Sequence, residues 1–338
     1  MMRKKATRKI IVFFLLLAAT VVCTMTACGI RRLMSDQEIH STSGQAPSTS
    51  TEQDPVATRT VSHVLGQTEI PLHPQRIVVL DANSDSLLDG VLALGLKPIG
   101  LARCSSCIKS DPFSDVVGDL PSVGTGEQPS LEKILMLKPD LILGYEWQES
   151  FYPKLSEIAP TVMVNPFAGG HDFKRNFRQL AEILGKSDQV DSALADYNEQ
   201  VQEFQQRFGE KLKSKTVSVI WFFESSFHVY GPEHLAMGSV MSEAGIQFIP
   251  IYKELGRDSL VNMSLESLPD WDADFLFVAL HFENDPEGLK AVFEQPLWST
   301  LKAVRNDQVY IMTESPSGGP IGASQFIDDL SEYFSSKL

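Results

Sequence analysis

The chain has 338 residues, of which 43% are hydrophobic, and a formal net charge of −14 at pH 7. This length exceeds one comfortable hydrophobic core, so two lobes with additional terminal segments are expected. Residues 1–27 contribute +5 to the charge, which leaves −19 on the remainder. Such an acidic body lacks the basic patch typical of nucleic-acid binding and does not attract anions from a distance. Any anion site must therefore be built locally from a few Arg side chains.

The N-terminus has the organisation of a secretory signal. A basic segment, residues 3–9, precedes the segment Ile10–Val22, which is apolar apart from Thr20. This apolar segment is short for a transmembrane helix and has the length of a signal-peptide core. Residues 1–27 are therefore predicted to be a signal peptide.

The segment Met25-Thr26-Ala27-Cys28 is similar to a bacterial lipobox, although Met25 stands where Leu is usual. We expect cleavage before Cys28 and lipid attachment to its thiol; the alternatives are simple cleavage after Ala27 and an uncleaved anchor. The next segment, residues 28–60, is rich in Ser, Thr, Gln and Pro and cannot bury enough apolar surface to fold. It is predicted to be a flexible tether that leaves the protein outside the cytoplasmic membrane, held by its lipid.

The predicted first lobe, residues 61–186, alternates strands with helices, which indicates a mainly parallel sheet covered by helices. We expect a hairpin over 61–72, strands at 74–81, 97–102, 141–143 and 161–164, a long loop over 103–121, and helices at 84–94, 130–138, 155–158 and 172–184.

A long helix is predicted over 187–213, because apolar residues from Val190 to Phe204 follow one face and Gln, Asp and Glu follow the other. A helix of that length spans roughly 38 Å and can cross between two lobes. The predicted second lobe, residues 214–338, repeats the alternation. Its strands are expected at 216–223, 275–280 and 309–312, and its helices at 238–244, from 266, at 290–293, 297–304 and 324–334.

One phrase of the first lobe, Ser130–Leu143, has a counterpart in the second, Ser264–Val278. Each predicts a short helix that is capped by Ser and carries a Glu near its start. A Pro or Asp then ends the helix, and an apolar strand follows. Glu132 and Glu266 suit the positive end of a helix dipole, which is worth about 0.3–1 kcal/mol when exposed. The alternative to that local role is docking to a partner with two basic sockets.

Two cysteines, Cys104 and Cys107, remain in the body of the chain, in the spacing Cys-Ser-Ser-Cys. Outside the cytoplasm a local disulfide is the expected state of such a pair. A metal site would need further ligands nearby, and a redox dithiol would need thioredoxin-like surroundings. Titration of the thiols in the native protein would separate a redox or adhesin module from a structural disulfide.

Several phrases, in this order and spacing, resemble the iron–siderophore and vitamin B12 type of ABC-transporter substrate-binding lipoproteins. The matching segments, beside the lipobox, are Pro74–Asp81, Leu92–Gly100, Ser130–Leu143, Ser264–Val278 and 296–310. The resemblance covers about residues 61–335. It implies an α/β fold of two Rossmann-like lobes joined by a single long α-helix, with ligand held between the lobes. In that family one Glu on each lobe pairs with Arg residues of a permease dimer, and Glu132 and Glu266 match those positions.

The ligand of such a fold is expected at the C-terminal ends of the strands, where open α/β sheets bind ligands. A ferric siderophore carries its iron already coordinated, so the protein needs Arg for its anionic oxygens and aromatic rings for its apolar rim. The candidate ligand-binding residues are Arg103, Tyr145, Trp147, Phe167, Trp221, Phe223, Arg257 and His281.

For several of these candidates a structural role remains open: Arg103 could pair with a nearby Asp, Arg257 could be a solvated loop charge, and His281 could make a structural hydrogen bond. Of Trp221 and Phe223, at least one is expected to face the core, and Trp271 and Trp298 are assigned to packing.

No catalytic residue is proposed, because the chain has no Gly-x-Gly-x-x-Gly after a strand, no Gly-x-Ser-x-Gly and no Walker loop. The seven His are scattered, which argues against direct metal binding by the protein, and no cofactor is expected beyond iron carried in the chelate. The expected partners are a ferric siderophore or related chelate, an ABC permease dimer and a membrane through the lipid, with the protein a monomer. Cobalamin or haem is the alternative ligand.

Overall fold

The computed structural model describes residues 57–81, 86–103, 113, 118–165, 172–223, 226–232, 236–255, 260–280, 290, 292–312 and 318–338, except for the side chains of Arg103, Phe223 and Leu260. Residues 53–338 form one compact unit. The predicted signal peptide, Cys28 as the predicted site of lipidation, and nearly all of the predicted tether lie outside the described residues.

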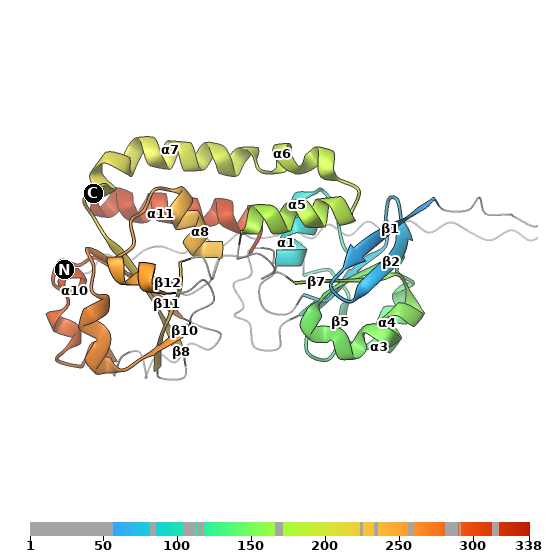
Figure 1. The fold of residues 1–338 in the computed structure, drawn as a ribbon, viewed down its shortest axis with the longest axis horizontal. Helices are drawn as coiled ribbons and strands as arrows, with labels where there is room; N and C mark the ends of the chain where they lie inside the picture. Colours follow the sequence, from blue (N-terminus) through green and yellow to red (C-terminus); the bar gives the residue numbers. More distant parts are fainter. Residues whose placement is uncertain are drawn as a thin grey trace, which may run out of the picture. The chain divides into compact units, whose positions relative to one another are not determined.

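The first sheet has five parallel strands in the order β5-β4-β3-β6-β7. These are β3 (Ile77–Val79), β4 (Gly100–Arg103), β5 (Ser122–Thr125), β6 (Leu141–Tyr145) and β7 (Thr161–Val164). Strand β5 was not predicted. The helices of this lobe are α1 (Ser86–Ala93), α3 (Leu131–Leu137), η1 (Glu146–Phe151), α4 (Tyr152–Ile158) and α5 (Phe173–Ile183), and β1 (Thr58–His63) pairs with β2 (Gly66–Pro71) as the expected hairpin (Figure 1).

The second sheet has the order β10-β9-β8-β11-β12. Strands β8 (Val217–Phe223), β11 (Phe275–Leu280) and β12 (Val309–Met312) are parallel, as predicted. Strands β9 (Ser226–Tyr230) and β10 (Leu260–Met263) add an antiparallel edge that was not predicted. The helices are α8 (Ala236–Glu243), η3 (Pro250–Glu254), η4 (Leu265–Trp271), η5 (Trp298–Thr300), α10 (Lys302–Arg305) and α11 (Pro320–Lys337).

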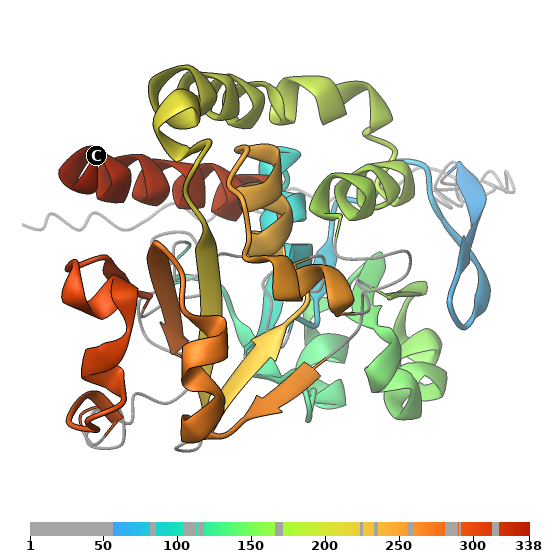
Figure 2. The same ribbon diagram turned by 60° about the vertical axis from the view of Figure 1, so that its left-hand side comes forward.

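The segment between the sheets begins as η2 (Ser187–Gln189) and α6 (Val190–Ala193), and the long helix is α7 (Ala195–Leu212). The predicted helix over 187–213 is therefore interrupted at Leu194, where the amide bonds to the carbonyls of Val190 and Ser192. Helix α7 packs along α11, with the ring of Phe334 about 6 Å from those of Phe204 and Phe208. Figures 1 and 2 show the two helices side by side.

The largest buried cluster is shared between the two lobes. It joins one face of the first sheet to α1, α5, α7, α8 and α11, and continues onto one face of the second sheet. The opposite face of each sheet has a smaller cluster of its own. The lobes are therefore joined by α7 along the chain and by continuous apolar packing in space, in which α11 contacts α1 as well as α7.

The repeated Asp of the two related phrases has a structural role at the N-terminal edge of each sheet. Asp140, directly before β6, accepts hydrogen bonds of 2.8 Å from the amides of Gln75 and Arg76, directly before β3. Asp274, directly before β11, accepts one of 2.9 Å from the amide of Thr216, directly before β8. In each lobe a carboxylate thus holds together the starts of two neighbouring parallel strands.

The two predicted Ser caps differ. Ser130 Oγ accepts a hydrogen bond from the Lys133 amide, and α3 is a regular helix that ends at Lys138, whose φ is 48°. Ser264 makes no such bond, and the helix after it is the 3₁₀ helix η4, which contains Pro269. The expected cap at Ser264 is therefore wrong, because the tighter 3₁₀ turn brings Ser267 Oγ onto the Ser264 carbonyl instead.

Candidate functional site

Tyr145 lies at the C-terminal end of β6 and is fully buried. Its hydroxyl donates to Asp81 Oδ1 at 3.0 Å and accepts from the Leu87 amide at 3.3 Å, with Ser86 Oγ 2.6 Å away. Asp81 Oδ2 in turn accepts from the Leu88 amide at 2.9 Å. These groups satisfy backbone donors in the first turn of α1, so the phenol of Tyr145 has a structural role at the start of that helix.

Trp147, two residues after Tyr145, is exposed, with a relative accessible surface of 44%. Its indole stacks on the ring of Tyr145, with ring centroids 4.2 Å apart and planes inclined by 20°. The buried Gln148 fixes this turn, since its amide nitrogen donates to the Leu80 and Gly126 carbonyls and its oxygen accepts from the Tyr145 amide. Trp147 is therefore an aromatic surface supported by a rigid base.

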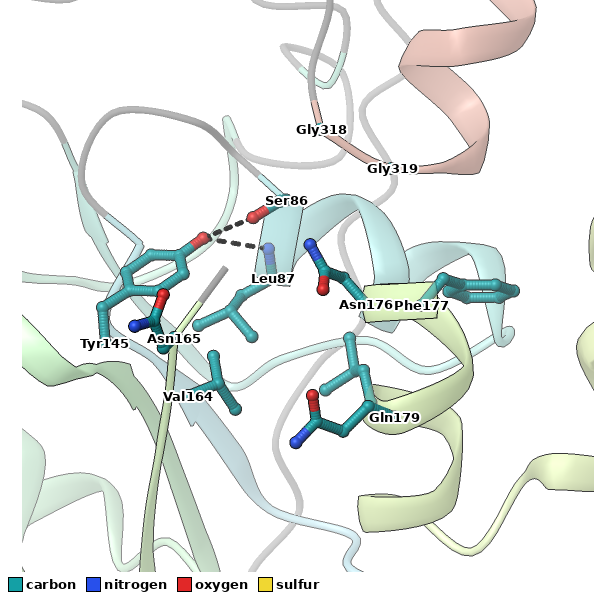
Figure 3. Close-up of a pocket in the computed structure, with 11 residues that line it drawn as sticks. Ser86, Leu87, Tyr145, Val164, Asn165, Asn176, Phe177, Gln179, Gly318 and Gly319 are labelled. Atoms are coloured by element: carbon teal, nitrogen blue, oxygen red, sulfur yellow. Dashed lines mark hydrogen bonds between the residues drawn. The ribbon is translucent and has the colours of Figure 1, made fainter. Parts of the chain in front are cut away.

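A shallow hollow, open to solvent, lies beside this turn. Its lining combines apolar side chains with neutral polar ones and two glycines: Ser86, Leu87, Tyr145, Val164, Asn165, Asn176, Phe177, Gln179, Leu180, Gly318 and Gly319. Figure 3 shows these residues around the hollow and the bonds from Tyr145 to Ser86 and Leu87. The described lining has no charged side chain, so it offers hydrogen-bond donors and acceptors without net charge.

The glycine pair at the hollow belongs to the start of α11, which contacts α1 through Asp89. Asp89 is fully buried, and its two carboxylate oxygens accept from the amides of Ile321 at 3.0 Å and Gly322 at 2.8 Å. A Cβ on Gly319 would come within 2.3 Å of the carboxylate carbon of Asp89. The hollow therefore adjoins the point where a first-lobe carboxylate caps the C-terminal helix.

The other predicted ligand-binding residues are placed as follows. Trp221 is only 6% exposed and packs edge-on against Tyr230, so it is a core residue, and Trp271 and Trp298 are buried as predicted. Arg103 and Phe223 end β4 and β8, as expected, and their side chains are not described. Phe167, Arg257, His281, Cys104 and Cys107 lie outside the described residues.

Sequence reasoning missed most of the hollow. Asn165 directly follows a predicted strand, and the strand-end rule that selected Phe167 applies to it equally. Asn176 and Gln179 are three residues apart on a predicted helix, and so share a face. No local signal pointed to Gly318 and Gly319, because their position depends on Asp89, more than 200 residues away.

Glu132 and Glu266 are both exposed and lie in the first turns of α3 and η4. Within the described part of the chain, no helix combines the length and the apolar character required to cross a membrane. No group of three or more potential metal ligands occurs among those same residues.

Two α/β lobes linked by a long helix, with a hollow at the C-terminal edge of a parallel sheet, define the architecture of a two-lobed binding protein. The chain belongs to the periplasmic binding protein family, whose model matches residues 77–316. The predicted family resemblance and the predicted fold class of two lobes and a long helix are thereby confirmed.

Two curated relatives are similar over most of their length. The probable siderophore-binding lipoprotein YfiY of Bacillus subtilis (strain 168) is 30% identical over 345 residues, covering 97% of this chain and 98% of the relative. The achromobactin-binding periplasmic protein of Dickeya dadantii (strain 3937) is 31% identical over 268 residues, covering 76% and 85%. The crystal structure of Staphylococcus aureus SirA complexed with staphyloferrin B has a TM-score of 0.68 at 27% identity, covering 82% of this chain and 99% of SirA.

Proposed function

We propose that this protein is the extracytoplasmic substrate-binding component of an ABC importer, and that it captures a ferric siderophore or a related chelate such as ferric citrate. The observation that carries the proposal is the hollow at the C-terminal edge of the first sheet, whose lining includes Tyr145, the residue on which the exposed Trp147 stacks. The names of two relatives, one siderophore-binding over 97% of this chain and one achromobactin-binding over 76%, support the class of ligand.

The chemistry of a ferric chelate fits the described groups. Its iron is already surrounded by oxygen donors, so the protein needs no metal ligand of its own and acts by hydrogen bonding, charge pairing and aromatic contact. Asn165, Asn176 and Gln179 offer amides, and Trp147 offers a ring. Arg103 and Arg257 are proposed to pair with the anionic oxygens of the chelate, and Phe167, Phe223 and His281 to complete the rim.

Delivery is proposed to take place at the membrane. Lipid on Cys28 holds the protein there, and Glu132 and Glu266 dock it on a permease dimer. Support for docking comes from the exposure of both carboxylates and from their equivalent places, in the first turn of a helix in each lobe. Glu132→Ala combined with Glu266→Ala should abolish uptake and leave ligand affinity unchanged; normal uptake by the double variant would end this assignment.

The ligand is tested by tryptophan fluorescence of the mature protein titrated with ferric hydroxycarboxylate, catecholate and hydroxamate siderophores, ferric citrate, haem and cobalamin. We expect saturable quenching by one ferric class, arising mainly from Trp147 because its indole is exposed and stacks on Tyr145, a residue of the hollow's lining. Trp147→Phe should remove most of the quenching, whereas Trp298→Phe, a buried control in the second lobe, should retain it. Saturable quenching by cobalamin or haem alone would show that this compound, and not a ferric chelate, is the ligand. Binding of none of the panel would contradict the proposed function.

A further inference from the structure

The outer surface of α3 is more apolar than its fold requires. Five of its seven residues are apolar, in the order Leu-Glu-Lys-Ile-Leu-Met-Leu. Ile134 is fully buried, and Leu131 and Leu137 pack against the same small core of the first lobe. Leu135 and Met136 instead face solvent, with relative accessible surfaces of 59% and 80%. The core therefore does not account for these two side chains, whose exposure has an unfavourable hydration cost.

These exposed side chains lie beside the docking carboxylate proposed above. Leu135 and Met136 follow Glu132 by three and four positions, a spacing that puts all three on one helix face. In the second lobe, Leu265 is 39% exposed and directly precedes Glu266. Seven large hydrophobic residues of the described chain are more than a third exposed, and three of them are these neighbours of the two Glu. The carboxylate and the apolar surface thus recur together in both lobes.

We propose that each docking surface combines a carboxylate with an apolar patch, and that the first-lobe patch, Leu135 and Met136, supplies much of the affinity for the permease. The proposal deepens the proposed function and rests on it. The matching socket on the permease is a basic side chain beside an apolar hollow. The two lobes are unequal, because the second-lobe patch is the single, less exposed Leu265. The first lobe should therefore contribute more to binding.

Charge decides between this partner and the other candidates. The body of the chain after residue 27 has a net charge of −19, which opposes close approach to an anionic lipid surface even though the exposed Lys133 and Lys138 flank the patch. A second copy of the chain would bring Glu132 against another acidic body. A protein socket with a basic group satisfies both the carboxylate and the apolar side chains. An exposed ion pair alone contributes little to affinity, whereas apolar side chains that become buried at an interface gain hydrophobic free energy.

The test compares variants of the full lipoprotein, expressed at limiting amounts, in cells that take up the quenching chelate and from which the native copy of the gene has been deleted. Leu135→Gln combined with Met136→Gln removes the apolar character at similar size. The matched control is Val64→Thr, an exposed apolar residue at the turn between β1 and β2. We expect the double variant to lower uptake on the order of tenfold, with ligand quenching and Tm unchanged, and the control to behave as the wild type.

A photo-cross-linking amino acid at position 136 provides the second measurement. The expected product joins this chain to an integral membrane subunit of an ABC permease, identified by its peptides, and position 64 should give none. A cross-link to lipid or to residues 28–56 of the same chain would overturn the proposal. Normal uptake by the Gln variant, with uptake lost in Glu132→Ala combined with Glu266→Ala, would overturn the apolar patch and leave the proposed function intact. Uptake that persists after deletion of the whole protein would overturn the proposed function itself.

Discussion

Asp274 shows how one side chain joins three elements of the second lobe. Its carboxylate accepts from the amide and hydroxyl of Thr216 and lies 2.8 Å from the Lys302 ammonium, at the start of α10. Burial by itself raises the pKa of Asp274, but the hydrogen bonds from Lys302 and Thr216 outweigh burial and hold the pKa below its ordinary value of 3.8. The ionised form is therefore favoured by the fold.

This pKa shift predicts a pH dependence for Asp274→Asn. A carboxyl group with a lowered pKa in the folded state stabilises the protein above its unfolded pKa, and the contribution disappears as pH falls through the folded pKa. At pH 7 the variant should therefore lose about 1 kcal/mol of unfolding free energy, and the difference from the wild type should shrink below about pH 3.8. Thermal unfolding at pH 7 and pH 3 measures it.

The matched control for Asp274→Asn is Asp270→Asn, an exposed carboxylate in η4 of the same phrase. The control should change Tm little at either pH. A Tm difference for Asp274→Asn that is as large at pH 3 as at pH 7 would contradict the assigned role, because it would show that the loss does not arise from the charge.

The contacts of single residues could be predicted only in part from the sequence. The repeated Pro or Asp break before an apolar strand predicted the strands correctly, but not that Asp140 and Asp274 bond to the residues directly before the neighbouring strands β3 and β8. Tyr145 was expected to line a cleft because it was placed in a loop after a strand, and it does line the hollow. The bond from its hydroxyl to Asp81, 64 residues away, could not be predicted from local pattern. Trp147 was expected in a loop; it lies instead in the 3₁₀ helix η1, with its ring exposed.

The N-terminus of helix α11 is capped by a residue of the other lobe. Asp89 of α1 satisfies two amides that would otherwise be buried without acceptors. Asp89→Ala should lower the unfolding free energy by about 2 kcal/mol or more, since loss of a cap typically costs about 1 kcal/mol and buried orphan donors add to it. Urea unfolding followed by tryptophan fluorescence and by circular dichroism measures this change.

Asp172→Ala separates the inter-lobe role of Asp89 from capping in general. Asp172 caps α5 within the first lobe, where its side chain accepts from the Arg175 amide. Its removal should lower stability by about 1 kcal/mol with one coincident transition. Asp89→Ala should in addition separate the two probes, because it weakens the coupling between lobes. Coincident transitions in both variants would show that Asp89 stabilises its helix without coupling the lobes.

The helix pattern was predictable where apolar spacing is regular, as in α5 and α8, whose ends at Gly185 and Gly245 have the expected positive φ values. The interruption at Leu194 could not be predicted, because Val190 and Leu194 fit one continuous apolar face. Nothing in that spacing distinguishes two helices from one. The antiparallel pair β9 and β10 was missed because their pairing depends on tertiary contact with β8.

In the whole molecule, the shared core limits how the lobes can move. Closure about α7 alone would be a simple bend, but α11 contacts α1 in the first lobe and α8 in the second. A large rotation would slide buried rings such as Phe204 and Phe334 past each other and break the bonds from Asp89. Packed interiors resist such changes, because even small losses of contact are costly.

Ligand binding should therefore change the radius of gyration by only about 1 Å or less, the displacement typical of pre-organised partners. Small-angle X-ray scattering of the mature protein with and without the quenching chelate measures this. Asp89→Ala supplies the internal comparison: with the α1–α11 bonds removed, the ligand-dependent change should increase, since the shared core alone then resists rotation. A change in the wild type as large as that of hinge-closing binding proteins would show that neither the core nor Asp89 holds the lobes, and that the hollow beside Gly318 and Gly319 is formed only on closure.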